Sequence, residues 1–217
     1  MAVLWSFSIF FWNSELEWFE EYIDRLLLET NKHSLGPYQT IGQAAKGAIL
    51  VRKGQVEAGI ILLRRSHEAM RDRRYGLLTD YIISLAEGLA ATGRDEEALD
   101  TIDQAIARVE HNGNLVSWPE LLRVKAEILI SAKNPDFVQA ERLLREALDS
   151  ASLQSCLGWE LRIATSLAKL WVLLGRQDEA RAVLAPVSGR FSEGFDRHDF
   201  KAASELLNEL NSPHLNS

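Results

Sequence analysis

The sequence predicts an all-α protein, a right-handed α-solenoid of about five helical hairpins with a capping helix at its C-terminal end. One observation is a pair of small residues that recurs along the chain in steps of 39 to 42 positions. Another is a short turn between the two members of each pair, as at Lys53-Gly54 and Leu174-Gly175. The third is composition, because leucine and alanine dominate and no sustained alternating run of valine, isoleucine or threonine indicates a sheet.

The small residues have a structural explanation. Two helices of a hairpin approach closely only where a side chain is nearly absent, so each pair is expected to mark a helix crossing. The pairs are Gly47 and Gly59, Ala86 and Ala98, Ala126 and Ala140, and Ala168 and Ala180. Larger apolar residues are expected to fill the core between successive hairpins; they are Leu50, Leu63, Leu89, Ile102, Leu129, Leu144, Trp171 and Leu184.

Residues 1–210 are expected to form a single domain, because each hairpin of a repeat array packs on its neighbours. Gly36-Pro37 separates the first hairpin from the second, and Pro119 suits the first position of a helix. A capping helix is expected at 197–210 with Asp196 as its N-cap, followed by a frayed tail at 211–217. The five hairpins are expected at about 2–30, 38–72, 77–111, 119–152 and 158–188.

Charge and cysteine content restrict the partners and the compartment. The net charge is −7 and the isoelectric point is near 5.3. Direct nucleic-acid binding normally needs a basic face, so this balance argues against it. Cys156 is the only cysteine, so an intrachain disulfide is impossible and a reducing, cytoplasmic location is expected.

The first twelve residues are apolar almost throughout. They are too few to span a bilayer, and they lack the early positive charge and the cleavage site of a signal peptide. We therefore interpret them as a helix of the first hairpin, with no membrane association. Because no earlier repeat would cover this helix, its apolar side chains are expected to form a homodimer interface or to dock on another chain. These residues are Trp5, Phe7, Phe10, Phe11 and Trp12.

The sequence holds no set of residues that would assemble a catalytic centre, so we expect a protein that is not an enzyme and has no cofactor. The five histidines are far apart, and none has another at metal-ligand spacing, so no metal site is expected. Carboxylate pairs such as Glu96-Glu97 lie in the first turn of a helix, where they complement the helix dipole. Cys156 lies in a loop and is interpreted as a partly buried, inert thiol rather than a nucleophile.

The repeat pattern resembles tetratricopeptide-type (TPR) repeats, with a period longer than the usual one. A narrower resemblance covers about residues 40–210 and is carried by the stretch from Trp159 to Trp171, by Gly175-Arg176, and by residues 184–187 and 191–196. These segments are similar to the C-terminal tails of large bacterial ATPase-type regulators. In such regulators a winged-helix DNA-binding domain or a class III nucleotidyl cyclase domain precedes the tail. The phosphate loop G-x-x-x-x-G-K-[ST] is absent from this sequence.

In TPR-like arrays the first helix of each hairpin lines a concave groove. The resemblance therefore implies that polar residues on these helices bind a ligand. Mixed charge would suit a peptide or helix that carries both signs. The alternative is that they are solvated residues with i, i+4 pairs, such as Arg123 with Glu127. The candidate residues are Arg52, Asp80, Ser84, Glu87, Arg123, Glu127, Arg162, Thr165 and Lys169.

Two functions follow from these patterns. The first is a non-catalytic scaffold that binds a protein or peptide, or senses a ligand, in a regulatory role. The second is the sensor tail of a bacterial signalling regulator that controls transcription or cyclic-nucleotide synthesis through a partner domain. In that case the partner would be a signalling ATPase, a cyclase or a transcription regulator.

Overall fold

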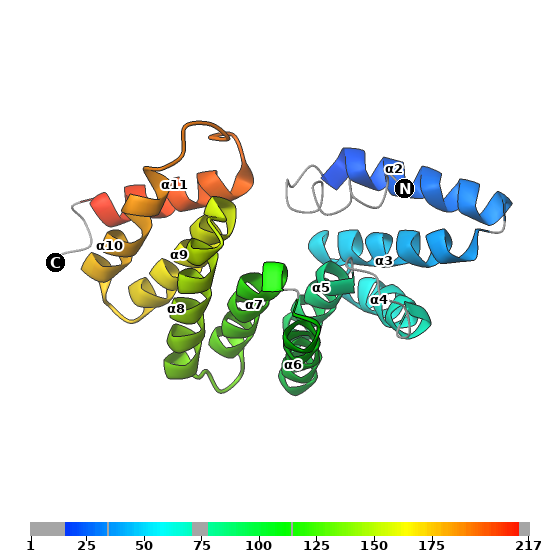
Figure 1. The fold of residues 1–217 in the computed structure, drawn as a ribbon, viewed down its shortest axis with the longest axis horizontal. Helices are drawn as coiled ribbons and strands as arrows, with labels where there is room; N and C mark the ends of the chain where they lie inside the picture. The colour runs from blue at the N-terminus through cyan, green and yellow to red at the C-terminus, as the bar shows by residue number, and fades with distance from the viewer. Residues whose placement is uncertain (1–15, 34, 71–77, 114, 213–217) are drawn as a thin grey trace. The chain divides into compact units, whose positions relative to one another are not determined.

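A computed structural model describes residues 16–33, 35–70, 78–113 and 115–212 of the chain (Figure 1). Within these ranges the chain forms ten α-helices, a single 3₁₀ turn and no β-strand. The elements are α2 (Leu16–Lys32), α3 (Gly36–Arg52), α4 (Val56–Met70), α5 (Leu78–Ala91), α6 (Asp95–Asn112), η1 (Leu115–Ser117), α7 (Trp118–Ser131), α8 (Phe137–Leu153), α9 (Leu157–Leu173), α10 (Gln177–Ser188) and α11 (His198–Asn211).

Consecutive helices pack as hairpins, with α3 on α4, α7 on α8 and α9 on α10. First helices also contact one another, α3 with α5 and α7 with α9, so successive hairpins are stacked. The helix ends that the structure describes at the limits of the hairpins and of the final helix lie within two residues of the expected bounds. The predicted first helix of the first hairpin lies outside the described residues, as do Trp5, Phe7, Phe10, Phe11 and Trp12.

The chain divides into two compact units, residues 1–105 and 106–217. The first contains α2 to α5 and the beginning of α6, and the second contains the end of α6 and everything that follows. The single domain expected over residues 1–210 stays a prediction.

Glycine closes the turn inside three of the described hairpins, at Gly54, Gly93 and Gly175. Gly54 has φ +80° and Gly175 has φ +75°, a left-handed conformation that other residues adopt only with strain. The amide of the next residue then reaches back into the preceding helix, as Arg176 N–H does when it donates to the Trp171 carbonyl at 2.7 Å. The hairpin α7–α8 has a different turn, in which the Asp136 carboxylate caps α8 by accepting from the Gln139 amide at 2.9 Å.

The predicted crossing of α3 and α4 is confirmed. A methyl group added at Gly59 would lie 2.6 Å from the Gly47 carbonyl oxygen, and one added at Gly47 would lie 2.9 Å from that of Gly59. The corresponding alanines in the later repeats are fully buried. Most of the predicted core residues are buried too, while Leu50 is half-buried.

The expectation that Asp196 caps the final helix is wrong. The N-cap of α11 is Arg197, with extended backbone angles (φ −68°, ψ 144°), and its side chain makes no capping hydrogen bond. Asp196 therefore lies one residue too early for its carboxylate to serve as the cap.

Candidate functional site: the charged face of α7 and α9

The C-terminal unit carries a row of charged and polar side chains where α7 and α9 pack together. On α7 the row follows i, i+3 and i+7 spacing, and on α9 it follows i, i+4 and i+7 spacing, so each set lies on one side of its helix. We call this row the charged face. It consists of Glu120, Arg123 and Glu127 on α7, and Arg162, Ser166 and Lys169 on α9.

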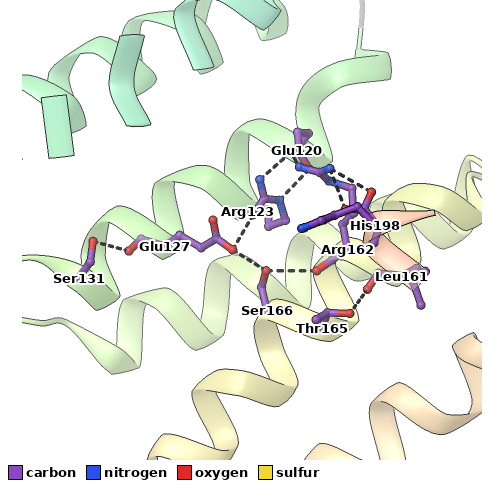
Figure 2. Close-up of polar contacts among 10 residues, drawn as sticks. Glu120, Arg123, Glu127, Ser131, Leu161, Arg162, Thr165, Ser166 and His198 are labelled. Atoms are coloured by element: carbon purple, nitrogen blue, oxygen red, sulfur yellow. Dashed lines mark hydrogen bonds and ion pairs between the residues drawn. The ribbon is translucent and has the colours of Figure 1, made fainter. Parts of the chain in front are cut away.

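Glu120 is the centre of the charged face, and its side chain is fully buried (0% exposed). Its carboxylate accepts hydrogen bonds from Arg123 Nε at 2.8 Å and Arg123 Nη2 at 2.7 Å, which is a bidentate pair. It also accepts from Arg162 Nη2 on the neighbouring helix at 2.8 Å. Figure 2 shows Glu120 between the two guanidinium groups. One buried anion is therefore held by two cations from two helices.

The ionisation of Glu120 follows from this geometry. Burial raises the pKa of a carboxyl group, because it disfavours the charged form. At Glu120 the positive charges of Arg123 and Arg162 and their hydrogen bonds outweigh burial, so the pKa of Glu120 lies below its ordinary value. The carboxyl group is consequently an anion at neutral pH. It serves as a fixed charge and not as a general acid.

The network continues along both helices to the surface. Arg123 Nη1 contacts Glu127 Oε1 at 2.5 Å, and the Ser166 hydroxyl donates to the same oxygen at 2.7 Å. At the other end Arg162 Nη1 donates to both oxygens of Asp199, the second residue of α11, at 3.1 and 3.3 Å. Arg162 therefore joins three helices, α7, α9 and α11.

The structure brings five of the predicted binding residues into this network or beside it. Arg123 is buried (5% exposed), and its ion pair with Glu127 is the i, i+4 pair that the alternative interpretation named. Thr165 is also buried, and its hydroxyl donates to the Leu161 carbonyl at 2.7 Å. Glu127 and Arg162 are partly accessible, and Lys169 is exposed further along α9. The accessible members of the charged face are thus Glu127, Arg162 and Lys169.

The other four predicted binding residues lie in the N-terminal unit. Asp80 and Ser84 are buried on α5, and the Ser84 hydroxyl donates to the Asp80 carbonyl at 3.1 Å. Glu87 is half-buried one turn further along α5, and Arg52 is half-buried at the end of α3. Ligand binding by any of the nine predicted residues stays a prediction.

Three residues of the network were not among the predicted site residues: Glu120, Ser166 and Asp199. Glu120 stands six residues before Ala126, and Arg162 stands six residues before Ala168, so the two occupy equivalent positions in successive repeats. Opposite charges at equivalent positions of neighbouring first helices predict a pair across the helices, and this signal would have found Glu120. Asp199 had no such signal, because α11 has no equivalent in the repeat.

The described residues provide little for other kinds of site. They contain no group of three histidine, cysteine, aspartate or glutamate side chains that could hold a metal ion. None of the helices that the structure describes combines the length and the apolar character that a membrane crossing requires. The charged face therefore stands out in the second unit because of its buried carboxylate and paired arginines.

The stacked hairpins define the class of fold, that of TPR-like helical-repeat proteins. The chain is similar to a crystal structure of nearly identical TPR-like repeats of a kinesin light chain from Podosopora anserina. That likeness has a TM-score of 0.61 at 17% identity and covers 80% of this chain and 86% of the other. BtubC (BKLC) from P. vanneervenii matches with a TM-score of 0.65 at 16% identity, over 91% of this chain and 90% of that one.

These structural matches confirm the predicted all-α solenoid of TPR-like hairpins, and at such low identity they show the fold alone. No protein-family model matches the sequence, and no curated protein matches it.

Proposed function

We propose that this protein is a non-catalytic scaffold that binds a protein or peptide partner along the first helices of its hairpins. The observation that carries the proposal is the charged face of α7 and α9. The buried pairing of Glu120 would be enough to stabilise the contact between α7 and α9. The charged face nevertheless extends outward to Glu127, Arg162 and Lys169, which are accessible and carry charges of both signs. Such a surface supplies orientation and selectivity toward a charged segment.

The buried part of the network supports binding in a different way. Arg123 and Arg162 are held by Glu120, so their side chains lose little further conformational freedom when a partner arrives. A surface whose charged groups are already ordered binds with a lower entropy cost than one of mobile lysines and glutamates. The charged face is therefore a preorganised surface.

A regulatory role for the scaffold is the finer part of the proposal. It rests on the resemblance of residues 40–210 to the tails of bacterial ATPase-type regulators. In that form the chain acts in the cytoplasm on a signalling ATPase, a cyclase or a transcription regulator. A reading frame for such a domain beside this one in the genome would favour this form. An unrelated frame there would favour a general interaction scaffold.

Affinity capture from a lysate of the source cell tests the proposal, with mild cross-linking and mass spectrometry to identify what is recovered. The wild-type chain is compared with Lys169→Glu, which reverses an exposed charge on the charged face. The matched control is Arg142→Glu, which reverses an exposed charge on α8, the second helix of its hairpin. We expect one protein to be recovered with the wild type and the control, and lost with Lys169→Glu.

Equal recovery with all three chains would remove the charged face from the proposal. Recovery of this chain alone would indicate self-association. The next variants would then replace the apolar residues predicted for a homodimer, beginning with Trp5 and Phe10.

A further inference from the structure

Arg162 holds two carboxylates whose surroundings differ. Glu120 is 0% exposed, so water cannot take the place of the Arg162 guanidinium if that pair breaks. Asp199 is 32% exposed, and the Arg162 side chain is 17% exposed. Pairs at the surface contribute little, because water solvates both ions when they separate. The Glu120 pair is therefore fixed, whereas the Asp199 pair can be exchanged.

Asp199 can release Arg162 without a movement of α11, because a rotation of its own side chain is enough. The buried residues of this helix are Ala203, Leu206 and Leu210, all in its middle and last turns. At its far end Arg181 Nε donates to Asn211 Oδ1 at 3.0 Å. Asp199 stands in the first turn beside Phe200, whose ring centre lies 5.5 Å from that of Phe191 and 5.0 Å from that of Phe195. The carboxylate can therefore leave Arg162 without disturbing the apolar contacts of the helix.

We propose that Arg162 is a binding residue for a carboxylate of the partner, and that Asp199 occupies this position until the partner displaces it. The inference rests on the proposed scaffold function and names the chemistry of the partner, a segment with acidic side chains. The Arg162 guanidinium is suited to this exchange because Glu120 fixes one of its edges while the other is directed to Asp199. It also lies 5.8 Å from the centre of the Trp159 ring, which further restricts it.

A second cation on α9 gives the partner segment its spacing. Lys169 is exposed and follows Arg162 by seven residues, so it lies on the same side of the helix about 10.5 Å further along at 1.5 Å per residue. A peptide in the polyproline II conformation directs every third side chain to one side, with a repeat of about 9.3 Å. Two glutamates separated by two prolines therefore match the distance between Arg162 and Lys169.

Fluorescence anisotropy with a labelled peptide that contains Glu-Pro-Pro-Glu tests the inference on the full chain. The same peptide with Gln-Pro-Pro-Gln is the control ligand. We expect the glutamate peptide to bind and the glutamine peptide not to bind. Asp199→Asn should tighten binding of the glutamate peptide by up to about five-fold, because the internal competitor loses its charge.

Asp196→Asn is the matched control protein, since it removes the same charge from an exposed residue three positions earlier. If it tightens binding as much as Asp199→Asn does, the effect is one of net charge and the inference fails. Lys169→Gln should weaken binding, and Arg162→Gln should abolish it. Because Arg162→Gln also touches the buried network, circular dichroism must show an unchanged helix content before its result counts.

The outcomes separate this inference from the proposed function. Capture of a partner that depends on Lys169, with equal peptide binding by wild type and Asp199→Asn, would keep the scaffold and overturn the role of Asp199. Tighter peptide binding by Asp199→Asn without any captured partner would support the carboxylate site and contradict a resident protein partner in that lysate. Absence of glutamate-peptide binding to every variant would overturn the carboxylate site.

Discussion

The hairpin α3–α4 is closed by backbone contact, whereas α7 and α9 are joined by charge. At the first place Gly47 and Gly59 let two helix backbones meet, and even a methyl group would collide with a carbonyl oxygen. At the second place Glu120 is buried between Arg123 and Arg162. Both regions belong to the same repeat architecture. The repeat therefore determines where the helices cross, whereas the type of side chain that packs beside the crossing differs from one hairpin to another.

Ile41 and Glu120 occupy equivalent positions in two different repeats. Ile41 stands six residues before Gly47, as Glu120 stands six residues before Ala126. Ile41 is buried (4% exposed) on α3, which packs against α2 with its buried Phe19. Glu120 is equally buried, but its carboxylate is paired with the guanidinium groups of Arg123 and Arg162. A repeat position thus tolerates an apolar or a charged residue when the neighbouring helix supplies the matching partner.

The largest effect is expected from Glu120→Gln. The substitution keeps the shape of the side chain but leaves Arg123 and Arg162 without their buried counter-charge. Breaking a buried pair on one side costs about 3 kcal/mol of unfolding free energy or more. Urea unfolding followed by circular dichroism would measure it. The control is Asp178→Asn, whose side chain is 98% exposed; an equal loss there would contradict the special role of Glu120.

Acid should remove part of the same stabilisation. The pKa of Glu120 is lowered in the folded chain, so its contribution is complete above the ordinary value of 4.5 and is lost as pH falls through the folded pKa. The unfolding free energy of the wild type should therefore decline below pH 4.5 more steeply than that of Glu120→Gln. Glu141, whose pKa is also lowered, titrates in both chains and cancels in the difference. Parallel pH profiles would contradict this assignment.

A smaller loss is expected from Gly59→Ala. The added methyl group meets the Gly47 carbonyl oxygen at 2.6 Å, and backbone cannot move aside as a flexible side chain does. Overpacking of this kind costs roughly 1–3 kcal/mol, and the helix preference of alanine offsets about 1 kcal/mol of it. Gly158→Ala is the matched control, because nothing lies within 4 Å of its added methyl group. Thermal unfolding should show destabilisation at Gly59 and none at Gly158.

The smallest effect is expected from Arg176→Gln. Arg176 donates to Glu141 at 2.8 Å and to Glu179 at 2.6 Å, and it lies 5.0 Å from the centre of the Trp171 ring. This cluster is more exposed than Glu120, so salt should screen it. Near 1 M NaCl, where the Debye length is about 3 Å, the difference from wild type should disappear. The loss of unfolding free energy caused by Glu120→Gln should persist at that salt concentration. Its disappearance would contradict the expected difference between the buried pairs of Glu120 and the more exposed pairs of Arg176.

Much of the fold followed from local rules. Small residues in steps of 39 to 42 positions indicated the helix crossings, and turn residues indicated the limits of the described hairpins to within two positions. The prediction failed at Asp196, where a capping residue stood next to a helix that begins one residue later. Capping depends on the backbone angles of one residue, and those are set by the packing of α11 on α9 and α10.

The charged face was predicted only in part. Arg123, Glu127 and Arg162 were identifiable as polar residues on first helices. The structure shows that Arg123 is buried, whereas Glu127 and Arg162 are partly accessible. Exposure depends on what the neighbouring helix places opposite a side chain, and a single helix pattern does not contain that information. The i, i+4 pair of Arg123 with Glu127 was local and therefore visible.

The sequence alone determined that the chain is helical, where its hairpins fall and which small residues meet, because these depend on periodicity and on turn chemistry within about forty residues. Only the tertiary structure decided that Glu120 is the buried centre of the charged face, and that Asp199 of α11 pairs with Arg162. Those contacts join residues 42 and 37 positions apart. Their energies arise from burial and from the approach of opposite charges, which exist only after the helices have packed.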